Sequence, residues 1–383
     1  QASFIFIQTA NRQLHYTKAL LKLSSRDVPQ KLLNHTKEID ALAKSGRKGS
    51  ATQAEKILAD MERRYEKGEK DIKPNTVTYN TFINSLAKSG EDDGPERAEA
   101  VLRNMLNRFL RGETDVKPDT ITFNSVIDAW ANSGFPSRAE QIMRKMDELS
   151  KLGDQDLRPD IMTFNAVINA YAKSSQKGLA SKAGQLLAEM EQRSIKEIHL
   201  KSNTVTYNTV INALAKSGEV DGPERAEAIL RNMMERYRSG EVDVKPDTIA
   251  FTSVIDAWAN SGDKRGPSRA EQIMRQMENL SKLGYEDLQP NARTYSMVIN
   301  AYAKSGEKGS MSKVEQLLAE MEQRSEKEKT LKPDTVTYNV ALNSLAKSGE
   351  FGAAQKAEAI LLEMLQHYIN GKEDVKPNTI SMN

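Results

Sequence analysis

The chain has 383 residues, of which 38% are hydrophobic and 28% charged, and its 55 basic and 53 acidic side chains leave a net charge of only +2. This balance excludes non-specific binding of nucleic acid driven by a large net positive charge. The complete lack of cysteine excludes disulfides, thiolate nucleophiles and cysteine-based zinc sites. No apolar stretch approaches the length needed to span a bilayer, so no contact with a membrane is expected.

Residues 1–31 match no later segment, and we expect them to form a capping helix or the eroded end of an earlier repeat. From residue 32 onward the chain repeats itself. A degenerate first unit is marked by "ALAKSG" at 41–46, and the later units, 41–44 residues apart, start at Thr76, Thr120, Ile161, Thr204, Thr248, Ala292 and Thr335. The sequence therefore predicts eight tandem repeats over 32–378. A further unit at 379–383 stops after five residues, as expected for a fragment cut in mid-helix.

Each repeat is predicted to form two short helices. In the second repeat, "KPNTVTYNTFINSLAKSG" at 73–90 has Asn75 at a favourable N-cap position and Gly90 as a favourable stop. The next segment, "GPERAEAVLRNMLNRFLRG", places five apolar residues on one helical stripe: Ala98, Val101, Leu102, Met105 and Phe109. Two such helices cannot bury a core alone, so the repeats must stack. The predicted fold is all-α, a right-handed α-solenoid of stacked helix-turn-helix repeats.

The first helix of each repeat has two distinct sides on a helical wheel. One side carries the residues expected to face neighbouring helices, which are Tyr79, Phe82, Ile83 and Leu86. The other side carries Val77, Asn80, Asn84 and Lys88. The same polar residue types return on this second side in every repeat. That pattern favours a shared function, but duplication would also preserve it, because 76–134 closely copies 204–262.

The motifs "VTYNTVINALAKSG", "AEAILRNM" and "VKPD" resemble the pentatricopeptide repeat family of organellar RNA-binding solenoids. The resemblance covers residues 32–383. The units are longer than the usual repeat of the family, with the added residues between the two helices and after the second one. These insertions affect the expected superhelical pitch and leave the first helix, which would carry the binding face, intact.

The resemblance implies that each repeat reads one unstacked RNA base with two side chains. The first is the Asn of "TYN" or its equivalent, which we call the reader, and the second is the residue after "KP". The implied pairs are Thr36 with Asn75, Asn80 with Asp119, Asn124 with Asp160, Asn165 with Asn203, Asn208 with Asp247, Thr252 with Asn291, Ser296 with Asp334, and Asn339 with Asn378. By the preferences of the family, these pairs imply the target 5′-AUUCUAG(C/U)-3′.

The resemblance also implies two supporting roles on the same face. The second residue of the first helix would wedge against the bases, at Val77, Ile121, Met162, Val205, Ile249 and Val336. The "AKSG" lysine would lie near phosphate, at Lys44, Lys88, Lys173, Lys216, Lys304 and Lys347. Arg293 occupies the wedge position of the repeat that starts at Ala292.

One comparison within the chain supports base reading. The segments "ITFNSVIDAWANSG" and "IAFTSVIDAWANSG" differ at two residues, and one is the reader, Asn124 in the first and Thr252 in the second. The closing residue changes as well, from Asp160 to Asn291. Both residues of the implied pair thus differ between near copies of one scaffold.

Each site also has a structural alternative. Asp119 and its equivalents stand where helix capping alone would select Asp or Asn. Asn80 could be a solvated residue of the first turn, and the lysines could simply complement the helix dipole. Trp130 and Trp258 are expected to be packing anchors rather than platforms for base stacking.

The sequence contains no recognisable catalytic, metal or cofactor motif. Its four histidines lack metal-ligand spacing, and no phosphate-binding Gly-rich loop is present. We therefore predict a non-enzyme without cofactors that binds single-stranded RNA sequence-specifically. By resemblance it would act in RNA processing, stability or translation in a mitochondrion or plastid. The alternative is a protein-binding scaffold with protein partners.

Overall fold

The computed structural model describes residues 28–174, 176, 178–307, 309–348, 352–370 and 375–378, except for the side chains of 286, 347 and 348. The described part is all-α and confirms the predicted α-solenoid of stacked helix-turn-helix repeats. The predicted capping segment at 1–31 lies mostly outside the described residues, and the unit at 379–383 lies wholly outside them. The first described helix begins at Gln30, two residues before the expected start of the first repeat.

The described residues form eight helix pairs. Their first helices are α2 (Gln30–Ser45), α4 (Thr76–Lys88), α6 (Thr120–Asn132), α8 (Ile161–Lys173), α10 (Thr204–Lys216), α12 (Thr248–Asn260), α14 (Ala292–Ser305) and α16 (Thr335–Ser348). Their second helices are α3 (Ser50–Glu66), α5 (Gly94–Leu110), α7 (Pro136–Lys151), α9 (Leu179–Ser194), α11 (Gly222–Arg238), α13 (Gly266–Lys282), α15 (Ser310–Ser325) and α17 (Ala353–Ile369). Single 3₁₀ turns follow the second helices: η1 (Lys70–Ile72), η2 (Thr114–Val116), η3 (Gln155–Leu157), η4 (Ile198–Leu200), η5 (Val242–Val244), η6 (Glu286–Leu288) and η7 (Lys329–Leu331).

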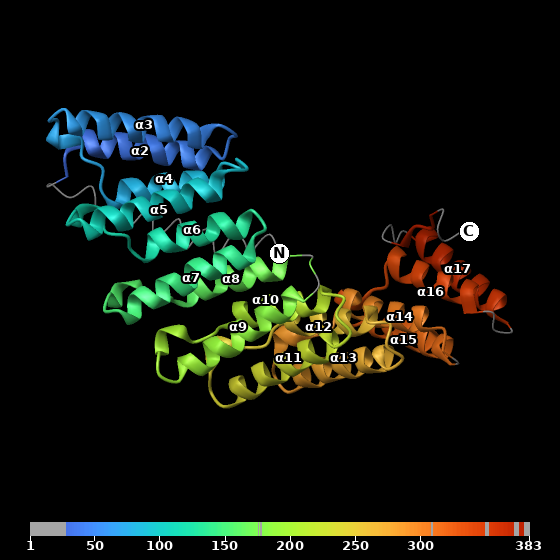
Figure 1. Cartoon of the computed structure of the whole chain (residues 1–383). Coiled ribbons are helices and arrows are strands. Elements are labelled where there is room, and N and C mark those ends of the chain that lie inside the picture. The colour runs from blue at the N-terminus through green and yellow to red at the C-terminus, as the bar shows by residue number, and fades with distance from the viewer. Residues whose placement is uncertain are drawn as a thin grey trace. The chain divides into compact units, whose positions relative to one another are not determined.

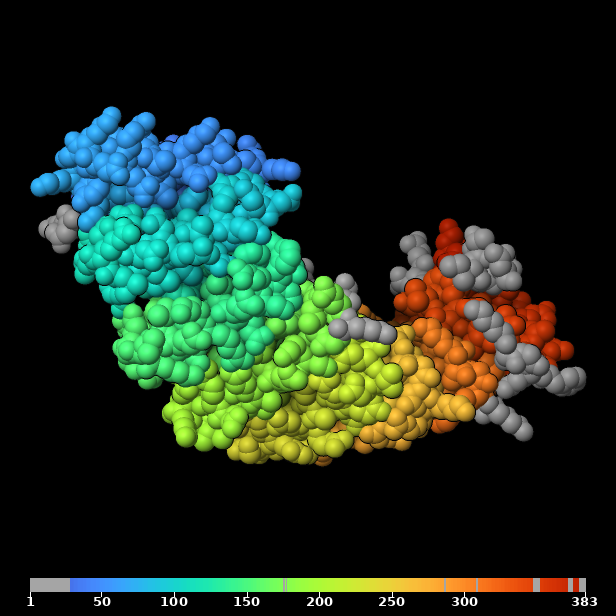
Figure 2. Space-filling model, in the orientation of Figure 1, coloured from blue at the N-terminus to red at the C-terminus, as the bar shows by residue number. Residues whose placement is uncertain are grey.

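The chain divides into two compact units, residues 1–174 with 193–200 and residues 175–192 with 201–383. In the first unit α2, α4, α6 and α8 pack side by side, and α3, α5 and α7 each contact both their own first helix and the next one. The second unit repeats this arrangement with α10, α12, α14 and α16. Within each unit the repeats form adjoining layers (Figures 1 and 2). The boundary between neighbouring first helices, here called the seam, therefore recurs throughout each unit.

The helix boundaries follow the predicted signals. Asn75 adopts an extended conformation and its side chain accepts a hydrogen bond from the Thr78 amide at 3.1 Å. Helix α4 ends before Gly90, whose φ of 65° lies in the left-handed region that glycine favours. At Gly94 a Cβ atom would lie 2.8 Å from the Leu86 carbonyl oxygen. Glycine therefore lets the second helix start close to the end of the first.

The core confirms most of the predicted stripe and adds residues that the stripe did not include. Ala98, Leu102 and Met105 are buried, whereas Val101 and Phe109 are half-buried. The last residue of each 3₁₀ turn inserts an aliphatic side chain into the core, and these buried residues are Ile72, Val116, Leu157, Leu200, Val244, Leu288 and Leu331. The turn before each new repeat is thus part of the hydrophobic core.

Trp130 and Trp258 are packing anchors, as predicted. Both are buried, and their indole N–H groups donate to Glu99 at 3.0 Å and to Glu227 at 2.9 Å. The Arg138 guanidinium lies over the Trp130 ring. The satisfied N–H and the covered ring leave these side chains without the open face that base stacking needs.

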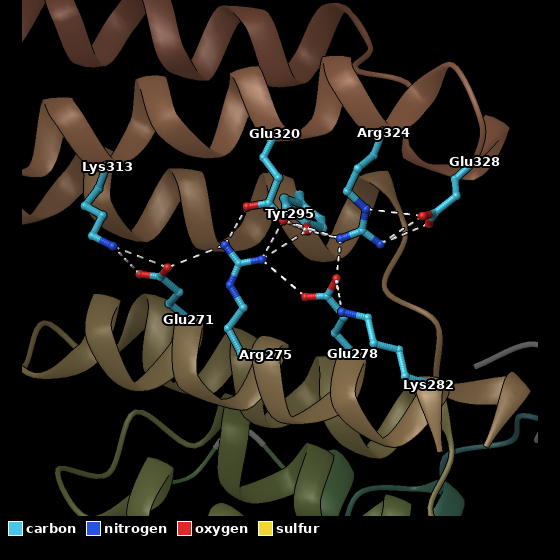
Figure 3. A network of polar contacts seen from close by, with 9 residues as sticks. All are labelled: Glu271, Arg275, Glu278, Lys282, Tyr295, Lys313, Glu320, Arg324 and Glu328. Atoms are coloured by element: carbon cyan, nitrogen blue, oxygen red, sulfur yellow. Dashed lines mark hydrogen bonds and ion pairs between the residues drawn. The ribbon is translucent and has the colours of Figure 1, made fainter. Parts of the chain in front are cut away.

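A polar network connects α13, α14 and α15 in the second unit (Figure 3). The buried Tyr295 donates its hydroxyl to Glu320 at 2.6 Å, and Arg275 reaches both oxygens of the same carboxylate at 2.6 Å. Arg324 contacts Glu278 at 2.5 Å and Tyr295 at 2.8 Å. In α4 and α10 the equivalent tyrosines, Tyr79 and Tyr207, donate instead to a glutamate on the second helix of the preceding repeat, Glu62 and Glu191. Where this position is tyrosine, its hydroxyl thus joins the first helix to a second helix packed beside it.

The charges of this network make the stability of the second unit depend on pH. Burial raises the pKa of the Glu320 carboxyl, but hydrogen bonds from Arg275 and Tyr295 outweigh that effect and lower the pKa to about 2. Because the folded pKa lies below the ordinary value of 4.5, the carboxylate stabilises the folded state above pH 4.5. That contribution is lost as the pH falls toward 2.

We predict that Glu320→Gln lowers the thermal midpoint by a constant amount between pH 5.5 and 8. The difference from the unmodified chain should narrow as the pH falls from 4.5 toward 2, since Glu320 takes up its proton below pH 4.5 in the unfolded chain but only near pH 2 in the folded one. Calorimetric melts over this pH series measure the effect, with the exposed Glu326→Gln as the charge-matched control. An equal effect of the two substitutions at every pH would contradict the role of the network.

Candidate nucleic-acid interface

The residue after each "KP" motif caps the next first helix. Asp119 has an extended backbone, its carboxylate accepts from the Thr122 amide at 2.9 Å, and the Thr122 hydroxyl accepts from the Asp119 amide at 3.0 Å. The same side-chain cap is present at Asn75, Asp160, Asn203, Asp247, Asn291 and Asp334. The capping role is therefore confirmed, so each of these residues has a structural role that holds whether or not RNA is bound.

The two residues of a predicted pair meet directly in three of the eight cases. The Asn80 amide nitrogen donates to Asp119 at 2.9 Å, although 39 residues separate them in sequence. Asn208 donates to both carboxylate oxygens of Asp247, at 3.1 and 2.9 Å. Asn339 donates to Asn378 at 3.2 Å. Each pair thus forms one polar site at a seam.

Three further pairs meet through a shared threonine, the third residue of the next first helix. The Thr163 hydroxyl lies 2.7 Å from the side-chain oxygen of Asn124 and 2.9 Å from that of Asp160. Ser296 and Asp334 share Thr337 in the same way, at 2.6 and 2.7 Å. Thr36 and Asn75 share Thr78, at 3.2 Å to each. Six of the eight predicted pairs are therefore brought together.

For the other two predicted pairs, Thr252 with Asn291 and Asn165 with Asn203, no contact that joins the two residues is described. Thr252 donates its hydroxyl to the Thr248 carbonyl of its own helix at 2.7 Å, while Asn291 caps α14. Asn165 is a buried residue of α8, and Asn203 caps α10. Because Asn165 and Asn203 belong to different compact units, each is described only within its own unit.

Burial divides the readers into two groups. Asn80 is only 3% exposed, which excludes the solvated alternative for this residue. Asn165, Asn208 and Asn339 are also buried. Asn124, Thr252 and Ser296 are half-buried, as are the N-caps from Asn75 to Asn291. Thr36 is 0% exposed, so the Asn75 side chain is the accessible part of the first site.

The predicted supporting residues lie closer to solvent. Ile249 and Val336 are 56% and 62% exposed, and the other wedge residues, Val77, Ile121, Met162 and Val205, are half-buried. Arg293 is exposed at its wedge position. The apolar wedge side chains thus range from half-buried to exposed, and the position is not apolar in the repeat that starts at Ala292.

The lysines of "AKSG" are mostly exposed. Lys44, Lys173, Lys216 and Lys304 are exposed and Lys88 is half-buried, whereas the side chain of Lys347 lies outside the described residues. Lys304 donates to Asn260 at 3.1 Å, which joins equivalent positions of neighbouring repeats. Lys44 forms an ion pair with Asp40 at 2.5 Å. The described side chains thus lie at or near the surface, and their proximity to phosphate stays a prediction.

Sequence reasoning missed one member of the site, the third residue of the next first helix. This residue is threonine at 78, 122, 163, 206, 294 and 337, and alanine at 250. The Thr122 hydroxyl lies 2.6 Å from Asn80 Oδ1, whereas Asn208 Oδ1 is buried without a hydrogen-bond partner beside Ala250. The signal was present in the sequence, because Thr122 and Ala250 are the other difference between the two near-copy segments.

Metal binding and membrane insertion find no support among the residues that the structure describes. That part of the chain holds no group of three or more histidine, aspartate or glutamate side chains able to share a metal ion. None of its helices has the length and apolar character of a membrane-spanning segment.

Comparison with known sequences identifies the repeats. A profile described as "Pentatricopeptide repeat domain" matches residues 111–173, 149–217, 228–305 and 280–348, which together exceed half of the chain. Profiles described as "PPR repeat" match residues 70–106 and 205–237. No curated protein matches the chain in the sequence search.

Solved structures of pentatricopeptide repeat proteins are similar to the chain. The maize protein PPR10 is 17% identical with a TM-score of 0.40, over 94% of this chain and 55% of that one. PPR10 in complex with an 18-nt psaJ RNA element is 22% identical with a TM-score of 0.40, over 94% of this chain and 48% of that one. The chain thus spans about half the length of the solved proteins that it matches.

The unpartnered oxygen of Asn208 generates a stability prediction. Ala250→Thr should raise the free energy of unfolding by about 0.5–1.5 kcal/mol, because the new hydroxyl can donate to Asn208 Oδ1. The equivalent threonines are buried at the same place in other repeats, so the pocket accepts this side chain. Denaturant unfolding measures the change.

The inverse substitution is the matched test. Thr122→Ala should lower the free energy of unfolding by about 1–3 kcal/mol, since it leaves Asn80 Oδ1 buried without that donor. If Ala250→Thr destabilises the chain, the assignment of the missing hydrogen bond is wrong.

Proposed function

Because the chain belongs to the pentatricopeptide repeat family, we propose that it binds single-stranded RNA, with one base at each seam. One observation carries the proposal. Between near-copy repeats the two residues that the family uses for reading both change, from Asn124 and Asp160 to Thr252 and Asn291. Asn124 and Asp160 are also a pair that the structure joins at a seam, through Thr163.

The chemistry of the sites suits this function. Asparagine, threonine, serine and aspartate provide short hydrogen-bonding groups of the kind that reads base edges, and the wedge residues provide apolar contact with base faces. PPR10, a similar protein, has been solved in complex with an 18-nt RNA element. The proposed target of this chain is 5′-AUUCUAG(C/U)-3′, with the N-terminal repeat at the 5′ end.

An organellar role in RNA processing, stability or translation, in a mitochondrion or plastid, belongs to the same proposal and rests on the family resemblance alone. In that role the chain would recognise the transcript by its sequence. Binding of a protein partner by the same surface is the outcome that the experiments below would favour if RNA is not bound.

Changing both residues of one site should change one letter of the target. Asn80→Thr combined with Asp119→Asn should shift the preference at the second base from U to A, and a mismatch there should cost about 1–3 kcal/mol by analogy with base-edge contacts. An asparagine, Asn75, caps α4 as Asp119 caps α6, so Asp119→Asn should keep the N-cap of α6. Fluorescence anisotropy with RNAs that differ only at base two measures the shift.

The fifth base is the internal control for that experiment, because its Asn208–Asp247 site is untouched and should keep its preference for U. An unchanged preference at both bases, with binding retained, would show that the letter assignment is wrong although the chain binds RNA.

The exposed lysines should contribute without regard to sequence. With up to six lysines near phosphates, the logarithm of affinity should fall against the logarithm of salt concentration with a slope no steeper than about −4. Lys216→Ala should weaken every RNA alike and reduce that slope by about 0.7. Salt titrations of matched and mismatched RNAs measure both effects.

Lys182→Ala removes the same charge from an exposed position on α9, a second helix, and serves as the control. Equal loss of affinity in the two lysine variants would argue against a phosphate path along the first helices.

A further inference from the structure

In four first helices the third residue contacts the reader of the preceding repeat, at Thr78, Thr122, Thr163 and Thr337. Thr122 Oγ1 is 2.6 Å from Asn80 Oδ1, and Thr163 Oγ1 is 2.7 Å from Asn124 Oδ1. Each threonine hydroxyl has one proton and also lies 2.9 Å from the N-cap carboxylate, at Asp119 Oδ1 and Asp160 Oδ1. Its shorter contact is with the carboxamide oxygen, where two acceptor oxygens would repel each other without a proton between them, so we assign the proton to that contact. The N-cap aspartate holds the nitrogen end of Asn80, and the threonine holds its oxygen end.

An asparagine held at both ends presents a fixed pattern of donor and acceptor. Rotation of the carboxamide by half a turn exchanges its oxygen and nitrogen, and a hydrogen-bond code works only if one orientation is kept. The two contacts fix that orientation before a base arrives. Such preorganisation removes part of the ordering cost of binding and improves discrimination.

The site of Asn208 lacks one of these contacts. Asp247 accepts from the Asn208 nitrogen as Asp119 does from Asn80, but Ala250 provides no hydroxyl and Asn208 Oδ1 has no hydrogen-bond partner. The two sites therefore carry the same implied pair, asparagine with aspartate, and differ in the threonine. The Asn208 site can therefore serve as the control for the Asn80 site within the same chain.

We propose that Thr122 and Thr163, the third residues of α6 and α8, are third members of the reading sites of Asn80 and Asn124, positioning residues that fix the carboxamide of the reader. The proposal rests on the proposed function. It assigns Thr122 and Thr163 to the second and third bases of the target and leaves the fifth base, at Asn208 and Ala250, less strictly read. Each letter then depends on residues of two successive repeats.

The test compares mismatch penalties at two bases with the same implied letter. RNAs with U replaced by each other base, at position two or at position five, are titrated against the full chain by fluorescence anisotropy. In the unmodified protein the penalty at base two should exceed that at base five by about threefold to tenfold. Thr122→Val, which keeps the shape and removes the hydroxyl, should reduce the penalty at base two by the same factor.

Two further variants separate positioning from stability. Thr122→Ser keeps the hydroxyl and should preserve the penalty at base two, while Ala250→Thr should raise the penalty at base five and leave base two unchanged. Melting curves of all variants establish that binding is measured on folded protein. A purely structural role would change affinity for all RNAs together and would leave the ratio between matched and mismatched RNA unaltered.

The outcomes distinguish failure of the positioning role from failure of the proposed function. If RNA is bound with the expected letters and the ratios do not respond to Thr122→Val or Ala250→Thr, the positioning role is overturned and the proposed function stands. If no RNA is bound, both are overturned. A selective change at base two with Thr122→Val and at base five with Ala250→Thr establishes the third member of the site.

Discussion

The side-chain hydrogen bond that caps the first helices from α4 to α16 is the interaction on which the rest of the structure depends. A repeat of two short helices cannot bury its own apolar stripe, so first helices must pack against one another within each unit. Their N-termini then lie at seams, where unpaired backbone N–H groups would be costly. Asp119 and its equivalents satisfy these groups, and by doing so they place a small polar side chain beside the reader of the preceding repeat.

This constraint explains how reading sites can diverge while the scaffold stays the same. Asparagine and aspartate cap helices about equally well, so an exchange such as Asp160 for Asn291 costs the fold little. The reader position likewise accepts asparagine, threonine or serine, since each can bond either to the next helix or to its own backbone. The seam therefore supplies a small set of interchangeable polar groups on a scaffold that stays the same.

The sequence was sufficient to predict the features that arise within a few neighbouring residues. The repeat period, the cap at Asn75, the stop at Gly90 and the buried face of Ala98, Leu102 and Met105 all follow from local pattern. Burial of Asn80 did not follow, because a wheel for one helix omits the neighbouring first helix that covers that side.

The missed features all depend on contacts between repeats. The Thr122 hydroxyl contacts Asn80, which is 42 residues away in sequence, and Arg275 contacts Glu320, which is 45 residues away. Val116 was not among the predicted core residues, yet it is buried, because the 3₁₀ turn η2 directs it inward. Such contacts form only when helices pack against each other, so they cannot be predicted from the sequence pattern of a single helix or repeat.

Selection of RNA from a random single-stranded pool by the purified 383-residue chain, at moderate salt, tests the central claim most directly. The account predicts enrichment of a motif close to AUUCUAG(C/U), read with the N-terminal repeat at the 5′ end. Absence of any enriched motif would contradict the account and would leave the seams as structural elements of a scaffold that binds protein.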